Sequence, residues 1–230
     1  MNGILLFDKP ILWTSHDTVD FFRKKIGQPR VGHAGTLDPL ATGLLVILLG
    51  SATKLSQKLG GLDKEYSGSL TLGMATDTQD LEGRVLGGGF LTAGFSVREE
   101  EVRRAFAGLK GVQEQRPPLY SAVKHRGRKL YELARSGVDL VSPARQITVH
   151  ALELLRFREP DVDFILRCSK GTYVRTLCDT LGRRLGCGAT LSSLVRTRVG
   201  VFDRRDALSE QALRRMSPEE LEGKLIDEGV

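Results

Sequence analysis

The amino-acid sequence predicts an α+β fold, and three segments carry this prediction. The continuous apolar run Leu44–Leu49 is typical of a strand buried on both faces, and Glu65–Leu72 alternates apolar and polar residues as a half-buried strand does. The segment Val97–Leu109 instead has the apolar spacing of an amphipathic helix. Because strand and helix patterns do not alternate as regular βαβ units, an α+β arrangement is favoured over a parallel α/β sheet.

The N-terminal part of the chain predicts a strand, a helix and an irregular segment. The strand is Gly3–Phe7, and it is closed by Pro10, which cannot continue a ladder of hydrogen bonds. Ser15 is the expected N-cap of a helix from about Asp17 to Lys25. The glycines and the proline within Val31–Gly43 predict a loop of special geometry.

The remaining elements are predicted by the same two signals, which are the spacing of apolar residues and the positions of glycine and proline. They are a helix at Ala52–Leu59, a polar turn at Thr76–Gly83, a flexible link at Gly87–Gly89, strands at Ile147–Phe157 and Asp163–Ser169, a helix within Gly171–Leu185, and short acidic helices within Leu208–Glu228. We expect one domain over residues 1–202, followed by a short helical tail over residues 203–230.

The charge of the chain is unevenly distributed. The net charge is +6, yet the tail from Asp203 onward holds 5 basic and 8 acidic residues. Residues 1–202 therefore hold 29 basic and 20 acidic residues, a surplus of +9. Such a surplus attracts polyanions through the release of their counterions, so nucleic acid is an expected partner.

Several other classes of protein are disfavoured. No apolar run approaches the roughly 18 residues that span a bilayer, and the N-terminus lacks the pattern of a secretory signal. We therefore expect a cytoplasmic protein without a membrane partner. The cysteines Cys168, Cys178 and Cys187 are odd in number and lack CxxC spacing, so we expect reduced, packed thiols in place of disulfides or a zinc site.

The most informative stretch surrounds Asp38. Three nearby glycines and Pro39 interrupt any regular period, so this carboxylate lies on a restrained loop directly before the buried strand. A rigid loop of this kind suits a catalytic group, but an aspartate before a proline also caps ordinary turns. No GK[ST] sequence follows, which argues against a phosphate-binding loop.

The stretch from Gly32 to Leu45 resembles the signature of TruB-type pseudouridine synthases, GH-[T/S/A]-G-x-LDP-x-A-x-G-[V/L]-L. Further segments resemble family motifs in the family's order, so the resemblance extends from residue 4 to about residue 202. They are Phe7–Asp17, Asp63–Tyr66, Gly73–Gly83, Pro117–Gly137, Cys168–Arg175 and Gly188–Gly200. The resemblance implies the pseudouridine synthase fold: a mixed, mostly antiparallel sheet flanked by helices, with an inserted basic flap.

The sequence departs from the family pattern in a few places. Leu12 stands where the family usually has glycine, Thr190 where histidine is common, and Val195 where arginine is frequent. Family members commonly continue into an RNA-binding PUA domain, whereas only 28 residues follow Phe202 here. We therefore expect no full PUA domain in residues 203–230.

The resemblance implies an isomerase that converts the uridine at position 55, in the T-loop of tRNA, to pseudouridine. This reaction breaks the N1–C1′ bond, turns the uracil and rejoins it through C5. An ionised carboxylate serves as a nucleophile at the sugar or as a base towards a ribose proton. The resemblance assigns this catalytic role to Asp38 and leaves open whether it acts as nucleophile or as base.

Because burying an unpaired charge is costly, we expect Arg175 to pair with the Asp38 carboxylate. By residue type alone, Arg175 also fits a surface or phosphate-contacting arginine.

Four more residues receive roles from the resemblance. Tyr66 is implied to stack on the flipped base, which recovers roughly 1–3 kcal/mol of the cost of unstacking. Tyr173 and Leu194 are implied to line the uridine pocket, and His33 to contact the RNA or fill the space that the base leaves. By residue type alone, Tyr66 and Leu194 are core residues and His33 is a structural histidine.

The segment Arg116–Arg135 is strongly basic, with six basic residues and interleaved Tyr120 and Tyr131. The pattern fits a solvated basic helix, whereas the resemblance implies a flap at about residues 116–137 that becomes ordered on binding RNA, which proteins read largely by shape and stacking. The candidates for RNA binding are Lys124, Arg126, Arg128 and Lys129.

No cofactor is expected, because the isomerisation has no redox step and no metal-ligand cluster is visible. Asp77 and Asp80 are capable of holding a cation, but a turn-ordering role is favoured. The expected partner is the T-arm of tRNA. We expect a monomer without an obligate protein partner.

Two other functions fit part of the sequence. A non-catalytic RNA-binding or RNA-folding protein is disfavoured because Asp38, Tyr66 and Arg175 are all present. A glycoside-cleaving enzyme that acts on free nucleosides or nucleotides would leave the basic stretch without a purpose. Assays with uridine or UMP as substrate separate the second alternative from a tRNA-modifying enzyme.

Overall fold

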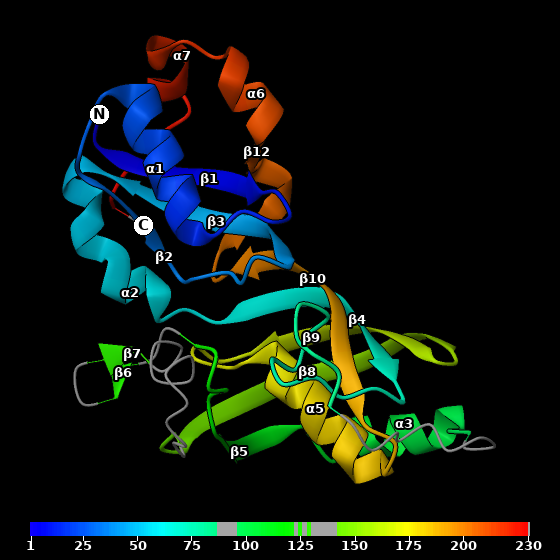
Figure 1. The fold of residues 1–230 in the computed structure, drawn as a ribbon. Helices are drawn as coiled ribbons and strands as arrows, with labels where there is room; N and C mark the ends of the chain where they lie inside the picture. The colour runs from blue at the N-terminus through cyan, green and yellow to red at the C-terminus, as the bar shows by residue number, and fades with distance from the viewer. Residues whose placement is uncertain (87–95, 122–123, 126–127, 130–141, 230) are drawn as a thin grey trace. The chain divides into compact units, whose positions relative to one another are not determined.

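The computed structural model describes residues 1–86, 96–121, 124–125, 128–129 and 142–229. The chain forms two compact units, Met1–Ser67 with Leu194–Val230, and Gly68–Ser193. Both termini therefore belong to the first unit (Figure 1). In the described ranges, no helix is both long and apolar enough to cross a membrane.

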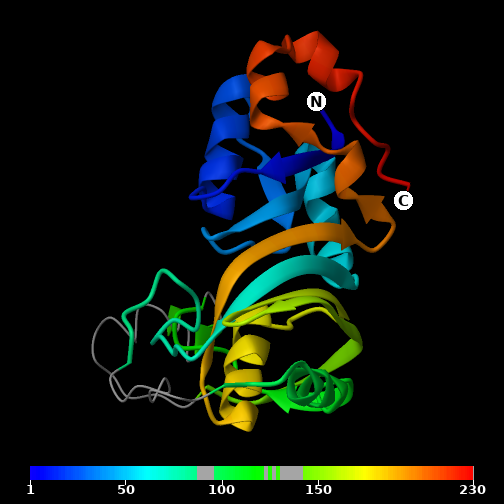
Figure 2. The ribbon, with the colours of Figure 1, turned by 90° about the vertical axis from the view of Figure 1, so that its right-hand side faces the viewer.

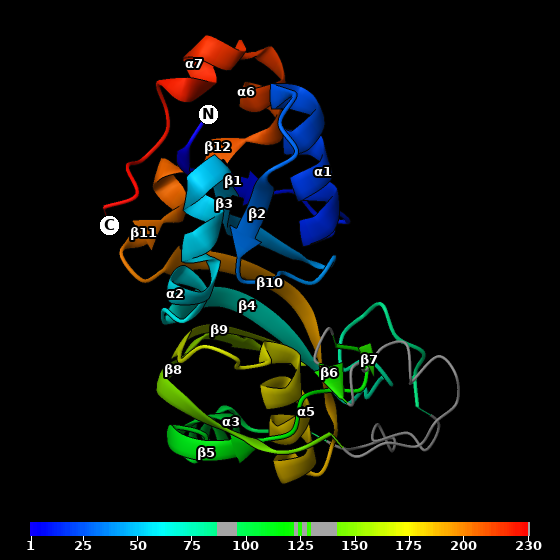
Figure 3. The ribbon, with the colours of Figure 1, turned by 90° about the vertical axis from the view of Figure 1, so that its left-hand side faces the viewer.

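The first unit is built around β3 (Ala41–Leu49), which contains the apolar run that predicts a buried strand. β1 (Gly3–Lys9) and β2 (Val31–Ala34) both pair with β3 in antiparallel orientation (Figure 3). β10 (Ala189–Val199) pairs with the start of β3 in parallel orientation, through Leu194–Arg196. The central strand is therefore flanked by segments from both ends of the chain.

Two short strands extend this sheet. β12 (Leu208–Ser209) lies parallel to β1, and β11 (Phe202–Asp203) pairs with the end of β10. The helical segments of the unit are α1 (Ser15–Ile26), η1 (Gly50–Leu55), α2 (Ser56–Gly60), η2 (Arg204–Asp206), α6 (Glu210–Arg215) and α7 (Pro218–Glu222). The short helices predicted in the tail are confirmed, and α6 lies beside β12 and β1 (Figure 3).

The second unit contains a sheet in the order β4, β9, β8, β5. β9 (Asp161–Cys168) and β5 (Gly111–Gln115) both pair antiparallel with β8 (Arg145–Arg158). β4 (Lys64–Leu72) belongs to both units, as does β10. α3 (Glu99–Ala107) and α5 (Val174–Leu185) lie beside each other in this unit (Figure 2). The predicted α+β class, with a mostly antiparallel mixed sheet, is confirmed.

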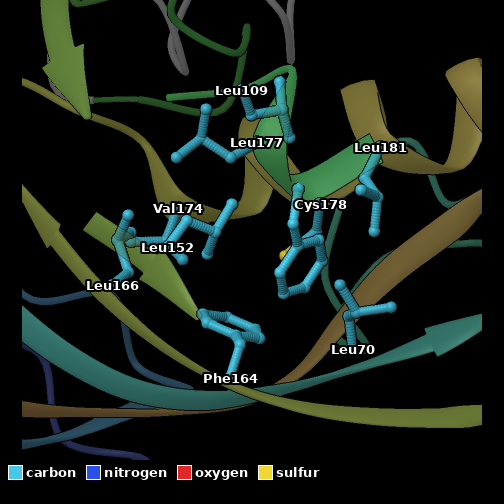
Figure 4. Close-up of a pocket in the computed structure, with 10 residues that line it drawn as sticks. Leu70, Leu109, Leu152, Phe164, Leu166, Val174, Leu177, Cys178 and Leu181 are labelled. Atoms are coloured by element: carbon cyan, nitrogen blue, oxygen red, sulfur yellow. The ribbon is translucent and has the colours of Figure 1, made fainter. Parts of the chain in front are cut away.

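A small cavity of about 10 Å³ lies in the core of the second unit, where α3 and α5 face the sheet (Figure 4). It is lined by Leu70, Phe106, Leu109, Leu152, Phe164, Leu166, Val174, Leu177, Cys178 and Leu181. Burial raises the pKa of the Cys178 thiol, so this group stays protonated. All three cysteines are buried and free, which confirms the expectation of packed thiols. The cavity is far too small for a nucleobase.

Two local predictions were wrong, and several strands were not predicted. The segment Val31–Gly43 is not one loop, because β2 occupies its start and β3 begins at Ala41, which leaves only residues 35–40 irregular. The first helix begins at Ser15, and its N-cap is Thr14. The strands β5 and β10 were not predicted, and β10 matters most because it carries part of the candidate site.

Candidate active site

Asp38 lies on the connection 35–40 between β2 and β3, and its neighbours along the chain are fixed by hydrogen bonds. Leu37 is held by Ser15, whose Oγ accepts from the Leu37 N–H at 2.8 Å and donates to the Leu37 carbonyl oxygen at 3.2 Å. On the other side, the Pro39 carbonyl oxygen accepts from the Leu12 N–H at 3.0 Å. The half-buried Asp38 carboxylate is thus carried by a backbone that is restrained both before and after it.

The start of α1 explains why Ser15 is available to hold this loop. Thr14 and Asp17 form a capping box, in which Thr14 Oγ1 accepts from the Asp17 N–H at 3.0 Å and the Asp17 carboxylate accepts from the Thr14 N–H at 2.8 Å. The N-terminus of α1 is therefore capped without the hydroxyl of Ser15. The buried Ser15 hydroxyl is left to bond with Leu37, 22 residues further along the chain.

Leu12 adopts a left-handed backbone conformation, with φ of 70°, at a position where the family usually has glycine. We expect Leu12→Gly to stabilise the protein. The change relieves about 1–2 kcal/mol of left-handed strain and costs about 0.5–1 kcal/mol in chain entropy. Little packing is lost, because the Leu12 residue is 74% exposed. Thermal unfolding is expected to shift upward by about 1–4 °C.

Ile11→Gly is the matched control for this substitution. Ile11 is also exposed and directly precedes Leu12, but its φ is not positive. Glycine at position 11 therefore brings the entropic cost without relief of strain, and we expect a lower unfolding temperature. An equal fall in unfolding temperature for both variants would contradict the strain at Leu12.

The register of β10 places two residues beside the start of β3. Leu194 lies opposite Ala41 and Arg196 opposite Gly43. Both are buried, as is Tyr66 on β4, which lies close enough to the Arg196 guanidinium to influence its pKa. Arg196 received no role from the sequence, although it belongs to a segment that resembles a family motif.

His33 lies on β2 with its imidazole largely buried, and its buried Nδ1 atom has no hydrogen-bond partner among the residues that the structure describes. Burial is the main cause of a lowered pKa, and the nearby positive charges of Arg196 and His16 act in the same direction. The imidazole is therefore held in its neutral form near neutral pH. A contact with RNA remains a prediction for this residue.

The lowered pKa of His33 predicts a pH dependence of stability. The unfolded chain takes up a proton near pH 6.5, whereas the folded chain resists protonation at this position. The contribution of the neutral His33 imidazole to the free energy of unfolding is therefore fully present above that pH, and it is lost as the pH falls below it. We expect His33→Gln to lose less stability than wild type between about pH 7.5 and about pH 5.5 in urea unfolding.

His150→Gln is the control for this measurement, because it removes an exposed histidine whose charge is not among those that act on His33. A loss of stability on acidification that is equal in His33→Gln and wild type would contradict the burial of an uncharged imidazole. The difference between variants is the decisive quantity, since the carboxylates of the chain titrate in all three proteins.

In the second unit, Arg175 is buried on α5 with a residue exposure of 4%. Its guanidinium donates to the carbonyl oxygens of Thr78 at 3.1 Å and Tyr120 at 2.7 Å. The carboxylate of Asp80, itself buried, lies 3.8 Å away. The interpretation of Arg175 as a surface arginine is therefore wrong.

Asp80 also orders the turn that it belongs to, as the sequence favoured. Its Oδ1 accepts from Thr78 Oγ1 at 2.5 Å and from the Glu82 N–H at 3.1 Å. Asp77 accepts from the Arg84 N–H at 2.8 Å within the same turn. Among the described residues, no group of three or more His, Cys, Asp and Glu side chains is arranged to hold a metal ion.

Tyr173 directly precedes α5, and its backbone is fixed by the side chain of Gln115. The Gln115 amide accepts from the Tyr173 N–H at 2.7 Å and donates to the Tyr173 carbonyl oxygen at 3.0 Å. The guanidinium carbons of Arg145 and Arg175 lie 5.3 Å and 5.7 Å from the centre of the Tyr173 ring. The geometry fits cation–π contacts that restrain this aromatic ring.

The basic flap is described only in part. Lys124–His125 and Arg128–Lys129 form the two short strands β6 and β7 of an antiparallel hairpin. Arg126 and residues 130–141 lie outside the described residues. Arg116, at the beginning of the flap, donates to the carbonyl oxygen of Ser142 at 3.1 Å, a residue that follows the flap in the sequence.

The six predicted site residues divide between the two units. Asp38, His33, Tyr66 and Leu194 belong to the first unit, and Tyr173 and Arg175 belong to the second. Within the first unit, the contacts of Arg196 connect the beginning of the Asp38 loop with Tyr66. Within the second unit, Tyr173 and Arg175 are in contact.

Comparison with known proteins decides the family. The profile described as TruB family pseudouridylate synthase, N-terminal domain, matches residues 23–174, and the profile of the tRNA pseudouridylate synthase B C-terminal domain matches residues 175–228. The chain belongs to the TruB family. It is therefore an isomerase of the pseudouridine synthase class, as the sequence predicts.

Individual TruB relatives match over nearly the whole chain. The tRNA pseudouridine synthase B of Opitutus terrae is 49% identical over 226 residues, which cover 98% of this chain and 92% of the relative. That of Syntrophotalea carbinolica is 46% identical, over 96% of this chain and 71% of the relative. These matches add to the family profiles, which cover residues 23–228 between them.

Solved structures support the same fold. A chain from the crystal structure of a Cbf5-Nop10-Gar1 complex is 30% identical, with a TM-score of 0.71 over 91% of this chain. A chain from an H/ACA RNP bound to a substrate RNA containing 2′-deoxyuridine is 26% identical, with a TM-score of 0.66. This chain spans about half the length of each, 52% and 51%. The predicted pseudouridine synthase fold is confirmed, and the roles of single residues stay predictions.

Proposed function

We propose that this protein isomerises the uridine at position 55 in the T-loop of tRNA, with Asp38 as the catalytic carboxylate. The observation that carries the proposal is the restraint of the Asp38 loop, where Ser15 holds Leu37 and Leu12 holds Pro39. A carboxylate on a backbone held from both sides is pre-positioned for chemistry. The relatives named tRNA pseudouridine synthase B support tRNA as the substrate.

The reaction requires the target uridine to leave its stack, at a cost of a few kcal/mol. In this proposal Tyr66 stacks on the flipped uracil, Leu194 and Tyr173 line its pocket, and His33 contacts the RNA. Asp38, in its ionised form, then attacks the ribose as a nucleophile or removes a proton from it as a base. Arg175 supplies the positive charge that keeps this carboxylate ionised.

Binding of tRNA is proposed to depend on the basic residues of the chain. The surplus of positive charge over residues 1–202 attracts the RNA backbone. The flap at about residues 116–137 then closes over the T-arm, with Lys124, Arg126, Arg128 and Lys129 as its contacts. We propose that the protein acts in the cytoplasm, as a monomer.

Tritium release from tRNA transcribed with [5-³H]uridine tests the proposal, because a new carbon–carbon bond at C5 expels the hydrogen of that carbon. We expect wild-type protein to release one tritium per tRNA. A transcript with cytidine in place of uridine 55 is expected to release none. Equal release from both transcripts would show that another uridine is the target.

The same experiment separates the competing functions. Wild-type protein that binds tRNA tightly without tritium release would act as an RNA-binding or RNA-folding protein. Conversion of free uridine or UMP, with no reaction on tRNA, would identify an enzyme of nucleoside metabolism. Either result would overturn the proposed activity on tRNA.

A further inference from the structure

Arg196 lies on β10 with its guanidinium enclosed by the first unit, and its residue exposure is only 1%. Its Nε donates to the carbonyl oxygen of Leu44 at 2.7 Å, its Nη2 to that of Gly35 at 3.0 Å and its Nη1 to that of Thr36 at 3.4 Å. Tyr66 on β4 lies close enough to the guanidinium to influence the pKa of Arg196. The described hydrogen-bond partners of this buried cation are thus main-chain carbonyl groups.

These carbonyl groups lie on both sides of Asp38 along the chain. Gly35 and Thr36 precede it at the beginning of the irregular connection, and Leu44 follows it in β3. One planar guanidinium therefore joins the beginning of the loop that carries the carboxylate to the strand that follows it. The fork of donors in arginine suits this arrangement, because it makes several bonds in fixed directions.

Two glycines of the signature make room for Arg196. Gly35 has a φ of 96°, and a Cβ atom added to it would lie 3.5 Å from Nη1 of Arg196. Gly43 has a φ of 98°, and an added Cβ atom would collide with the backbone of Arg196. The spacing of these glycines is explained by the close approach of β10 as well as by the turn itself.

We propose that Arg196 is a positioning residue, which sets the location of the Asp38 loop relative to the Tyr66 hydroxyl and so aligns the carboxylate with the ribose. The proposal rests on the function proposed above and extends it to a residue outside the six assigned to the site. Arg196 acts through the backbone of the loop and through Tyr66. Its contribution is alignment for the chemical step, so it affects turnover more than the affinity for tRNA.

Lysine does not replace arginine in this position. The ammonium group of a lysine side chain would keep the positive charge, but it is a compact donor without a planar fork. At least one of the carbonyl groups of Gly35, Thr36 and Leu44 would lose its partner, and the loop would relax. A misplacement of about 1 Å in an active site lowers the rate by about 100-fold.

The test compares Arg196→Lys with Arg198→Lys in the full chain. Arg198 lies on the same strand, with its side chain 48% exposed and an ion pair to Asp203 at 4.0 Å, so it receives the same chemical change outside the site. Both variants are assayed below their unfolding temperatures, with saturating tRNA in single turnover. The affinity for tRNA is measured separately by filter binding.

We expect Arg196→Lys to lower the single-turnover rate about 100-fold, with an affinity for tRNA within about threefold of wild type. Arg198→Lys should keep the wild-type rate. A folded Arg196→Lys protein with the wild-type rate would overturn the proposal, as would a loss that appears only in affinity. Absence of activity in wild-type protein would instead overturn the proposed function itself.

If Arg196→Lys does not fold, an isosteric replacement still tests the proposal. The sequence Gly186-Cys187 allows a synthetic segment 187–230, with citrulline at position 196, to be joined to residues 1–186. Citrulline keeps the shape and the Nε donor but replaces one terminal nitrogen by an acceptor oxygen. We expect a slowed chemical step relative to the same ligated chain with arginine, and equal rates would overturn the proposal.

Discussion

Substitution of Asp38 by asparagine is expected to abolish tritium release from tRNA, with a rate loss of about 10⁴-fold or more. Asparagine has nearly the shape of aspartate but is neither an anionic nucleophile nor a base at neutral pH. The hydrogen bonds that restrain the loop use the main chain of Leu37 and Pro39, so they persist in the variant. We therefore expect a folded protein with unchanged affinity for tRNA.

Two further variants make this result specific. Asp20→Asn removes an exposed carboxylate of α1 that pairs with Arg23 at 3.0 Å, and we expect full activity from it. Asp38→Glu keeps the carboxylate but moves it by one methylene group, and a loss of about 100-fold would show dependence on position. Activity of Asp38→Asn within tenfold of wild type would remove Asp38 from the mechanism.

Substitution of Arg175 by methionine is expected to lower both activity and stability. Methionine keeps much of the volume but leaves the carbonyl groups of Thr78 and Tyr120, and the carboxylate of Asp80, without their guanidinium. We expect the free energy of unfolding to fall by about 2–4 kcal/mol. If Arg175 also stabilises the ionised catalytic carboxylate, the rate falls by about 1000-fold.

A second substitution separates these two effects of Arg175. Asp80→Asn, added to Arg175→Met, removes the charge that the first change leaves buried. We expect the double variant to recover part of the stability but none of the activity. Recovery of both would assign Arg175 a purely structural role. Arg183→Met is the control on the same helix, since its side chain is 70% exposed and its ion pair contributes about 1 kcal/mol or less.

Local sequence signals predicted much of the fold. The apolar run Leu44–Leu49 and the alternation of Glu65–Leu72 both lie in strands, because burial on one or two faces leaves a direct trace in residue type. β10 was not predicted, because its buried positions are not all apolar. Arg196 occupies one of these buried positions and interrupts the apolar pattern that indicates a strand.

The candidate site was predictable where it depends on a motif and unpredictable where it depends on main-chain partners. Asp38 stands out because glycines and a proline surround it. The bonds from Ser15 to Leu37 and from Arg196 to Gly35 leave no comparable trace, because every residue has a carbonyl group. Ser15 was mistaken for the helix cap, since Thr14 beside it has an equivalent hydroxyl.

The bond between Arg196 and Gly35 spans 161 residues of chain, and this separation has a consequence during protein synthesis. At about 5–20 residues per second, Arg196 is joined to the growing chain roughly 8–32 s after Gly35. Until then the nascent Asp38 loop lacks the strand that completes it, even though its own residues have long been made. We therefore expect a ribosome-bound chain truncated before β10 to be inert towards tRNA.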